Sequence, residues 1–106
     1  MSIQEITTEE EFNKLINNTF VIIDFYAQWC GPCKTFVPKF KELSLKYPNV
    51  KFAKVDVDEV QEIADLCQVK SLPTFIAFEN GQIFDSTIGA NYEQVVKLIN
   101  DLITID

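Results

Sequence analysis

Histidine and arginine are both missing from this sequence, so its nine basic residues are all lysines. The 16 acidic residues outnumber them, and the formal net charge is −7. A strongly acidic chain repels nucleic-acid phosphates and anionic lipid headgroups, so we expect no nucleic-acid partner and no membrane-surface function. Zinc sites usually combine cysteine with histidine or use two cysteine pairs, and the lack of histidine therefore argues against zinc.

Long apolar runs and targeting signals are also lacking. The apolar run at residues 20–23 ends at Asp24 and is far too short to span a bilayer. The opening MSIQEITTEEEF has neither the basic nor the apolar region of a secretion signal. We therefore expect a soluble, cytoplasmic protein. In that reducing compartment three cysteines do not form a disulfide framework, and a C-x-x-C pair is more often catalytic or metal-binding.

The sequence has no internal repeat, low-complexity tract or flexible linker. Its 106 residues are 47% hydrophobic, which is enough to bury a core without disulfides. Length and composition together predict one domain over residues 1–106.

Strand and helix signals alternate along the chain. Apolar, β-branched and aromatic residues predict strands at residues 2–6, 20–26, 50–57, 74–79 and 82–88. The last two flank Asn80-Gly81, a strong two-residue hairpin signal. Helical spacing and capping residues predict four helices. The first is capped by Thr8 and the last by Asn91, with Glu11 and Gln94 at the capping-box positions three residues later. The second begins near Cys30, and Asp58 can cap the short third helix. Val37 is expected on the apolar face of the second helix.

This order predicts an α/β fold with a mixed five-stranded sheet and helices on both faces. Strands linked by a helix are expected to pair in parallel with right-handed crossovers, whereas the closing hairpin is antiparallel. In open sheets of this kind the chemistry lies beyond the carboxyl ends of the central strands. The segment WCGPCK, residues 29–34, lies at such an end.

The two cysteines of WCGPCK allow three interpretations. A metal site would need four ligands, but only one distant further cysteine is present. A structural disulfide across two residues closes almost no loop, so it constrains the unfolded chain little. A redox-active pair is favoured over both.

The redox interpretation has a specific physical basis. If a helix begins near Cys30, the Cys30 sulfur faces unpaired N–H groups and the positive end of the helix dipole, which lowers the pKa of its thiol. Pro32 suits the first helical turn, and Gly31 allows a tight backbone turn. Cys30 is expected to be the exposed sulfur and Cys33 to face the interior. No histidine stabilises the thiolate further, which favours a reductant over an oxidant.

WCGPCK together with a downstream Pro-Thr-Phe is a highly specific combination. The chain also has Asp24 in VIIDFYAQWC, Pro38, AKVDVD, VKSLPTF, the FENGQ hairpin and IGAN before the last helix. With these features the chain resembles the thioredoxin family over essentially its whole length.

The resemblance implies a sheet in the order 1-3-2-4-5 flanked by four helices, and the reduction of protein disulfides. It implies Cys30 as the attacking nucleophile and Cys33 as the resolving thiol of a redox-active disulfide, with no bound cofactor or metal. Electrons would come from NADPH through a thioredoxin reductase. The implied clients are peroxiredoxin, ribonucleotide reductase and methionine sulfoxide reductase, and the protein would act as a monomer in electron transport and cell redox homeostasis.

Asp24 and Lys54 are the expected supporting residues. Burial in the strand would raise the pKa of Asp24 toward neutrality, which suits a general base that takes the proton of Cys33. The resemblance assigns the same role; the alternative is a strand-end aspartate that reaches solvent. Lys54 would face Asp24 and lower its pKa, or else be an ordinary surface lysine.

Substrate-binding residues are expected around Cys30. By resemblance the Leu72–Pro73 bond is cis, which would place the Leu72 backbone where an extended client segment can pair with it; a trans proline at a strand start is the alternative. Trp29 would form a flat apolar wall for the client rather than ordinary core. The remaining members of this small apolar rim are Ile88, Gly89 and Ala90.

Cys67, near the end of the short third helix, has two interpretations. It is either a buried packing residue or a reactive, regulatory thiol, as proposed for the extra cysteines that animal cytosolic thioredoxins carry in this region.

Two rival functions remain beside a disulfide reductase. The first is a disulfide isomerase or oxidase, whose domains usually carry histidine between the cysteines. The second is a thioredoxin-fold adapter subunit, which needs no cysteines. The CGPC segment, Asp24 and Pro73 favour the reductase.

Overall fold

The computed structural model describes residues 3–105, and its elements follow the order predicted from the sequence. The strands are β1 (Gln4–Glu5), β2 (Phe20–Tyr26), β3 (Lys51–Asp56), β4 (Thr74–Glu79) and β5 (Gln82–Ile88). The helices are α1 (Glu9–Ile16), α2 (Gly31–Lys46), α3 (Gln61–Leu66) and α4 (Tyr92–Ile103). Residue 2 of the predicted first strand lies outside the described residues.

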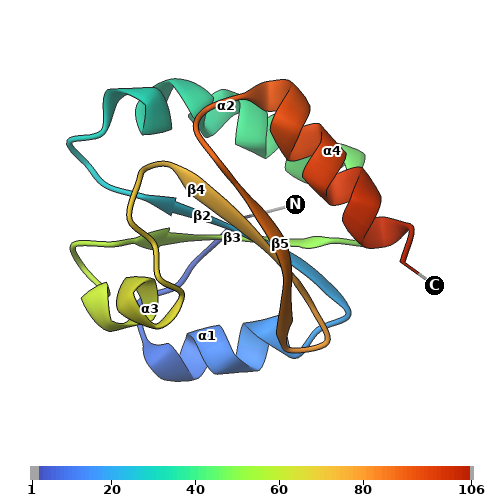
Figure 1. Cartoon of the computed structure of the whole chain (residues 1–106), viewed down its shortest axis with the longest axis horizontal. Helices are drawn as coiled ribbons and strands as arrows, with labels where there is room; N and C mark the ends of the chain where they lie inside the picture. Colours follow the sequence, from blue (N-terminus) through green and yellow to red (C-terminus); the bar gives the residue numbers. More distant parts are fainter. Residues whose placement is uncertain (1–2, 106) are drawn as a thin grey trace.

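The five strands form one sheet in the order β1-β3-β2-β4-β5 (Figure 1). β1 and β2 run parallel to β3, whereas β4 is antiparallel to both β2 and β5. α2 and α4 cover one face of the sheet, and α1 and α3 cover the other (Figure 1). The predicted mixed α/β sheet, its strand order and its four helices are confirmed.

One strand pairing differs from the expectation for helix-linked strands. β4 follows β3 through α3, yet it runs antiparallel to its neighbour β2. α3 has six residues and is about 9 Å long, whereas the six residues of β3 extend over about 20 Å. α3 therefore does not return the chain along the sheet, and β4 starts at the end where β3 stops (Figure 1). The expected parallel pairing is wrong for β4.

β2 lies in the middle of the sheet and is buried on both faces. Val21, Ile23 and Phe25 belong to the core under α1 and α3, whereas Ile22 belongs to the core under α2 and α4. Successive side chains of a strand point to opposite faces, so Asp24 points to the same side as Ile22. The apolar segment predicted at residues 20–26 thus places one carboxyl inside the protein, beneath α2.

Tilted phenylalanine rings build the core under α2 and α4. The rings of Phe36 and Phe40 lie 5.0 and 5.6 Å from that of Phe75 on β4, measured between centroids. Val37 is exposed, so its predicted place on the apolar face of α2 is wrong. Consecutive helical residues point about 100° apart, and Phe36 already faces the core.

Two of the predicted helix caps are confirmed. The backbone N–H of Glu11 donates to the Thr8 hydroxyl at 3.1 Å, and that of Gln94 donates to the Asn91 side chain at 3.1 Å. The hairpin turn is also confirmed, because Asn80 and Gly81 have positive φ values of 52° and 89°. Within residues 3–105, no helix has the length and apolar character that crossing a bilayer would need.

Asp58 does not cap α3, which corrects the third predicted cap. α3 begins at Gln61 after Val60, which makes no side-chain capping hydrogen bond. The backbone N–H groups of Glu59 and Val60 both donate to the carbonyl of Asp56, and this turn delays the start of the helix. The Asp58 carboxylate is thereby free to bind a different donor, the Trp29 indole.

Candidate active site

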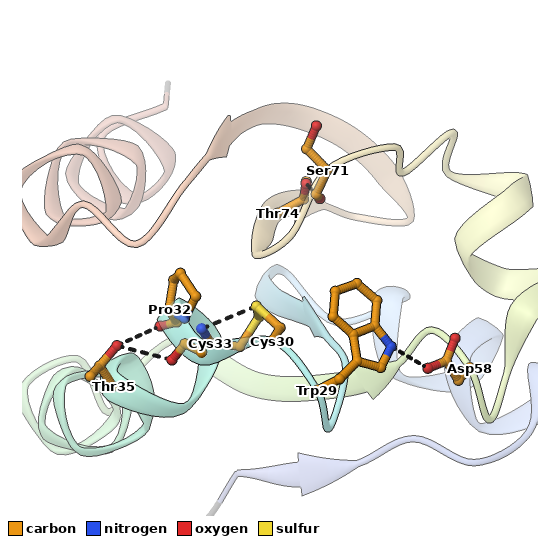
Figure 2. The surroundings of a disulfide bond; sticks show 9 residues. Trp29, Cys30, Pro32, Cys33, Thr35, Asp58, Ser71 and Thr74 are labelled. Atoms are coloured by element: carbon orange, nitrogen blue, oxygen red, sulfur yellow. Dashed lines mark hydrogen bonds between the residues drawn. A yellow bond between two sulfur atoms is a disulfide. The ribbon is translucent and has the colours of Figure 1, made fainter.

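The two cysteines of the CGPC segment form a disulfide at the start of α2 (Figure 2). β2 leads the chain to this point, and Cys30 is the N-cap residue of the helix. The backbone N–H of Cys33 donates to the Cys30 sulfur at 3.2 Å. Pro32 lies in the first turn, where its missing N–H removes no helical bond. The predicted place of the Cys30 sulfur, at a helix N-terminus, is confirmed.

Two local predictions about this segment are wrong. Cys30 is only 5% exposed, against 2% for Cys33, because Val57 and Leu72 pack against the small cluster that contains the two cysteines. The Cys30 side chain is therefore covered except where it borders a groove. Gly31 is already a helical residue of α2, so no left-handed turn requires glycine there.

An apolar groove of about 440 Å³ opens beside Cys30. Trp29 forms part of its wall and is 70% exposed, so this indole is not a core residue. The indole N–H donates to the Asp58 carboxylate at 2.8 Å, which fixes the ring beside the disulfide (Figure 2). The remaining lining residues are Gly31, Pro32, Val57, Val69, Lys70 and Leu72.

The loop before β4 contributes to the same groove as Trp29 and Cys30. The Leu72–Pro73 bond is cis, as the resemblance implied, and Leu72 lines the groove. The Gly89 N–H donates to the Pro73 carbonyl at 2.8 Å and ties the end of β5 to the start of β4. Ile88, Gly89 and Ala90 lie at this end but are not among the residues that line the groove.

Gly89 has a φ of +102°, a left-handed backbone that favours glycine. Apart from Gly89 itself and its two chain neighbours, no described residue has an atom within 4 Å of the place a Cβ would take, so crowding is not the reason for glycine. Open space beside the backbone at this position suits the approach of another chain.

Asp24 is buried as predicted, at 5% exposure, and its Oδ1 atom has no hydrogen-bond partner among residues 3–105. Burial raises the pKa of the carboxyl from 3.8 to about 7, with Lys54 lowering this pKa and Glu5 raising it. Asp24 and Cys33 line one cavity of about 180 Å³, which Lys54 also borders. A carboxyl that titrates near neutral pH thus shares a cavity with the interior sulfur.

Glu5 and Tyr26, two further residues near Asp24, were not identified from the sequence. Lys54 is the register neighbour of Asp24, and its ammonium lies 3.6 Å from the Glu5 carboxylate. The Tyr26 hydroxyl donates to the same carboxylate at 3.0 Å. A glutamate in a two-residue strand carries no local signal of such a contact. Only the parallel register, which pairs Glu5 with Lys54, reveals it.

Cys67 ends α3 and packs, half-buried, against the core under α1 and α3. Burial raises the pKa of its thiol to about 11, so it stays protonated and weakly nucleophilic at neutral pH. This favours the packing interpretation over the regulatory one. Within the part of the chain that the structure describes, no cluster of three or more potential ligands is placed to hold a metal ion.

A disulfide that closes so short a loop adds little to folding stability, because it hardly restricts the unfolded chain. Its surroundings instead suit a bond that is repeatedly made and broken. Cys30 lies at a helix N-terminus and borders an open groove, and Cys33 shares a cavity with a titratable carboxyl. The fold and this site define a class of proteins, the thiol–disulfide oxidoreductases.

Comparison with known proteins narrows this class to one family. The sequence model of the thioredoxin family matches residues 3–101. Thioredoxin of Sus scrofa is 43% identical over 104 residues, which cover 95% of this chain and 99% of that protein. Thioredoxin-2 of Pyricularia oryzae is 40% identical over 101 residues, which cover 94% of this chain. The match covers only 59% of the length of that protein. The chain belongs to the thioredoxin family.

A solved structure supports the same assignment. It comes from work on the thiol-resolving mechanism of yeast mitochondrial 1-Cys peroxiredoxin via glutathione/thioredoxin systems. Its matching chain has a TM-score of 0.91 and 44% identity, over 94% of this chain and 95% of that one. With the Cys30–Cys33 disulfide in place, the chain is a thiol–disulfide oxidoreductase of the protein-disulfide reductase type. Neither the adapter nor the isomerase or oxidase alternative is favoured.

Proposed function

We propose that this chain reduces protein disulfides in two exchange steps, with Cys30 as nucleophile, Cys33 as resolving thiol and Asp24 as general base. One observation carries the proposal: the interior sulfur of Cys33 shares a cavity with a buried carboxyl whose pKa is raised to about 7. The base is therefore close to the thiol that must lose its proton, and it titrates in the range where the reaction occurs.

In the first step the reduced Cys30 attacks a client disulfide as a thiolate. The unpaired N–H groups at the start of α2 stabilise the negative sulfur, and the N–H of Cys33, 3.2 Å from the Cys30 sulfur in the disulfide, is one of these donors. A bond forms between Cys30 and one client sulfur while the client disulfide breaks. The other client sulfur leaves as a thiolate and takes a proton from solvent.

In the second step Cys33 gives its proton to Asp24 and attacks the Cys30 sulfur. The Cys30–Cys33 bond forms, the bond from Cys30 to the client breaks, and the second client sulfur leaves as a thiolate. Two electrons have then passed from the cysteine pair to the client. The cavity of about 180 Å³ has room for a water that relays the proton, and its acceptor would be the Oδ1 of Asp24, which has no partner among residues 3–105.

The client segment would bind across the groove. Trp29 and Leu72 both line the groove that Cys30 borders, and the Leu72 backbone would pair with an extended client strand. The exposed side chain of Ile88 and the open space at Gly89 would accommodate the continuation of that strand. Such a surface favours mobile or unfolded disulfide segments over buried ones.

The electron supply and the partners belong to the same proposal. NADPH would deliver two electrons through a thioredoxin reductase, which reopens the Cys30–Cys33 bond after each cycle. Peroxiredoxin is a proposed client because a similar structure comes from work on thiol resolving in a peroxiredoxin via glutathione/thioredoxin systems. Ribonucleotide reductase and methionine sulfoxide reductase follow from the family resemblance. We place the protein in the cytoplasm, since a dithiol reductant and a free Cys67 thiol both suit a reducing compartment. We propose that it acts there as a monomer.

Insulin-disulfide reduction, with NADPH and a thioredoxin reductase as the electron source, tests the proposal. We expect Cys30→Ser to abolish turnover and Cys33→Ser to accumulate a mixed disulfide with insulin chains. Cys67→Ser is the matched control, because it removes a thiol outside the site, and it should keep full activity. Turnover by both the Cys30 and the Cys33 variants would refute the assignment.

A further inference from the structure

Glu5 does not touch the disulfide, yet it is bound to residues beside the proposed base. Its carboxylate lies 3.6 Å from the Lys54 ammonium and accepts the Tyr26 hydroxyl through both oxygens, at 3.0 Å each. The Lys54 ammonium lies 5.6 Å from the centroid of the Tyr26 ring. Side chains from β1, β2 and β3 thus form one connected group, and Glu5 is its only anion.

Lys54 connects this group to the active site. It is the register neighbour of Asp24, and both residues line the cavity that contains Cys33. A cation close to a carboxyl favours its ionised form. The position of the Lys54 ammonium relative to Asp24 therefore affects how readily Asp24 accepts a proton, in addition to the larger effect of burial.

We propose that Glu5 is a positioning residue for disulfide reduction: it holds the Lys54 ammonium at the β1 edge of the cavity and so keeps Asp24 able to take the proton of Cys33. This inference rests on the proposed role of Asp24 as base. Without Glu5 the ammonium would be both uncompensated and free to turn toward Asp24. The charges of these two residues act on the Asp24 pKa in the directions that this role requires. The Lys54 ammonium lowers the pKa, and the Glu5 carboxylate raises it.

The other neighbours of Asp24 do not supply this control. On β4 its register neighbour is Phe75, which carries no charge. On β2 the Tyr26 hydroxyl stays protonated at neutral pH, because burial and Glu5 raise its pKa. α2 contributes Cys33 and the exposed Lys34 to the cavity. Among these groups, Glu5 and Lys54 are the opposite charges in contact.

Titration of the Asp24 carboxyl by ¹³C NMR in the oxidised protein, where neither Cys30 nor Cys33 carries a proton, tests the inference directly. Glu5→Gln removes the charge with little change of shape, and we expect the midpoint to fall by on the order of half a pH unit. Glu10→Gln on the exposed surface of α1 is the matched control and should leave it unchanged. An unchanged midpoint in Glu5→Gln would overturn the proposal.

Lys54→Met provides a second and independent variant. It should raise the Asp24 midpoint, and Glu5→Gln should shift the midpoint less in this background than in the wild type. An equal shift in both backgrounds would mean that Glu5 does not act through Lys54. An unaltered midpoint in Lys54→Met would overturn the inference even if Glu5→Gln failed to fold.

The rate at which the mixed disulfide resolves, measured against pH in single-turnover experiments, separates this inference from the proposed function. The pH profile of Glu5→Gln should move to lower pH together with the NMR midpoint. A profile that stays in place while the midpoint moves would refute the role of Glu5 in the reaction. A neutral-pH step that persists in Asp24→Asn would instead refute Asp24 as the base, and the NMR titration would still decide how Glu5 affects the carboxyl.

Discussion

Replacing Asp24 by asparagine should stabilise the protein, and the gain should depend on pH. The side chain is 5% exposed and borders a small cavity beside α2, and its Oδ1 atom has no hydrogen-bond partner among the described residues. Asparagine has nearly the same shape but no ionised form. The variant therefore removes the cost of a buried charge while it leaves packing almost intact.

The magnitude follows from the raised pKa of Asp24. The difference between 3.8 and about 7 corresponds to about 4 kcal/mol, because one pH unit in pKa is worth about 1.4 kcal/mol. Since the folded state has the higher pKa, it binds more protons than the unfolded chain between these two values. The free energy of unfolding of the wild type therefore falls as pH rises toward 7, and the full cost is present above that pH.

The assay is urea unfolding of both oxidised proteins, followed by far-UV circular dichroism across pH. Relative to Asp24→Asn, the wild type should lose about 2 kcal/mol between about pH 5.5 and about pH 8.5. Taking the difference between the two proteins cancels every group that they share. The series can stop near pH 8.5, because Asp24, with its pKa raised to about 7, is then almost fully ionised in both the folded and the unfolded chain.

Parallel stability curves for the two proteins would contradict the reasoning, since they would mean that the carboxyl titrates alike in the folded and unfolded chains. The same variant should slow release of the client from the mixed disulfide. More stability with less activity is the combination expected when a buried charge is kept for chemistry.

Three further outcomes test the fold and the groove. Thr8→Ala should lower the free energy of unfolding by about 1 kcal/mol in urea titrations, because the cap on Glu11 is lost, and Thr8→Ser should not. Gly81→Ala should cost about 1–2 kcal/mol in the same assay, since its φ is +89° and the new Cβ would lie 3.0 Å from an Asn17 oxygen; an unchanged midpoint would count against the turn geometry. Asp58→Ala should free the Trp29 indole and raise KM for a client about threefold at constant kcat. It should also lower the fluorescence anisotropy of Trp29, the only tryptophan of the sequence. Equal anisotropy in the two proteins would argue against the Trp29–Asp58 hydrogen bond.

Local signals identified the elements well. The strand predicted at residues 20–26 matches β2 residue for residue, and the Asn80-Gly81 pair lies at the hairpin turn. These features depend on backbone preferences and on the two-residue period of a strand, both of which are written in adjacent residues. The same local reasoning failed at Asp58, which was expected to cap α3. The backbone N–H groups of Glu59 and Val60 donate to the Asp56 carbonyl in a turn, and the helix therefore begins later, at Gln61.

The cysteine pair and its helix were also accessible from the sequence, because spacing and the Gly-Pro pair fix their relation. The near-complete burial of Cys30 was not, since it comes from Val57 and Leu72 in distant segments. Likewise, the antiparallel direction of β4 follows from a helix too short to return along the sheet, and a strand signal contains no direction.

By itself, the sequence determined which segments form strands and helices and that a redox-active cysteine pair begins α2, because short-range stereochemistry governs both. Only the tertiary structure decided the environment of Asp24. Its proton affinity depends on burial under α2 and on the distances to Lys54 and Glu5, and these residues, on three different strands, come together only through the register of the sheet.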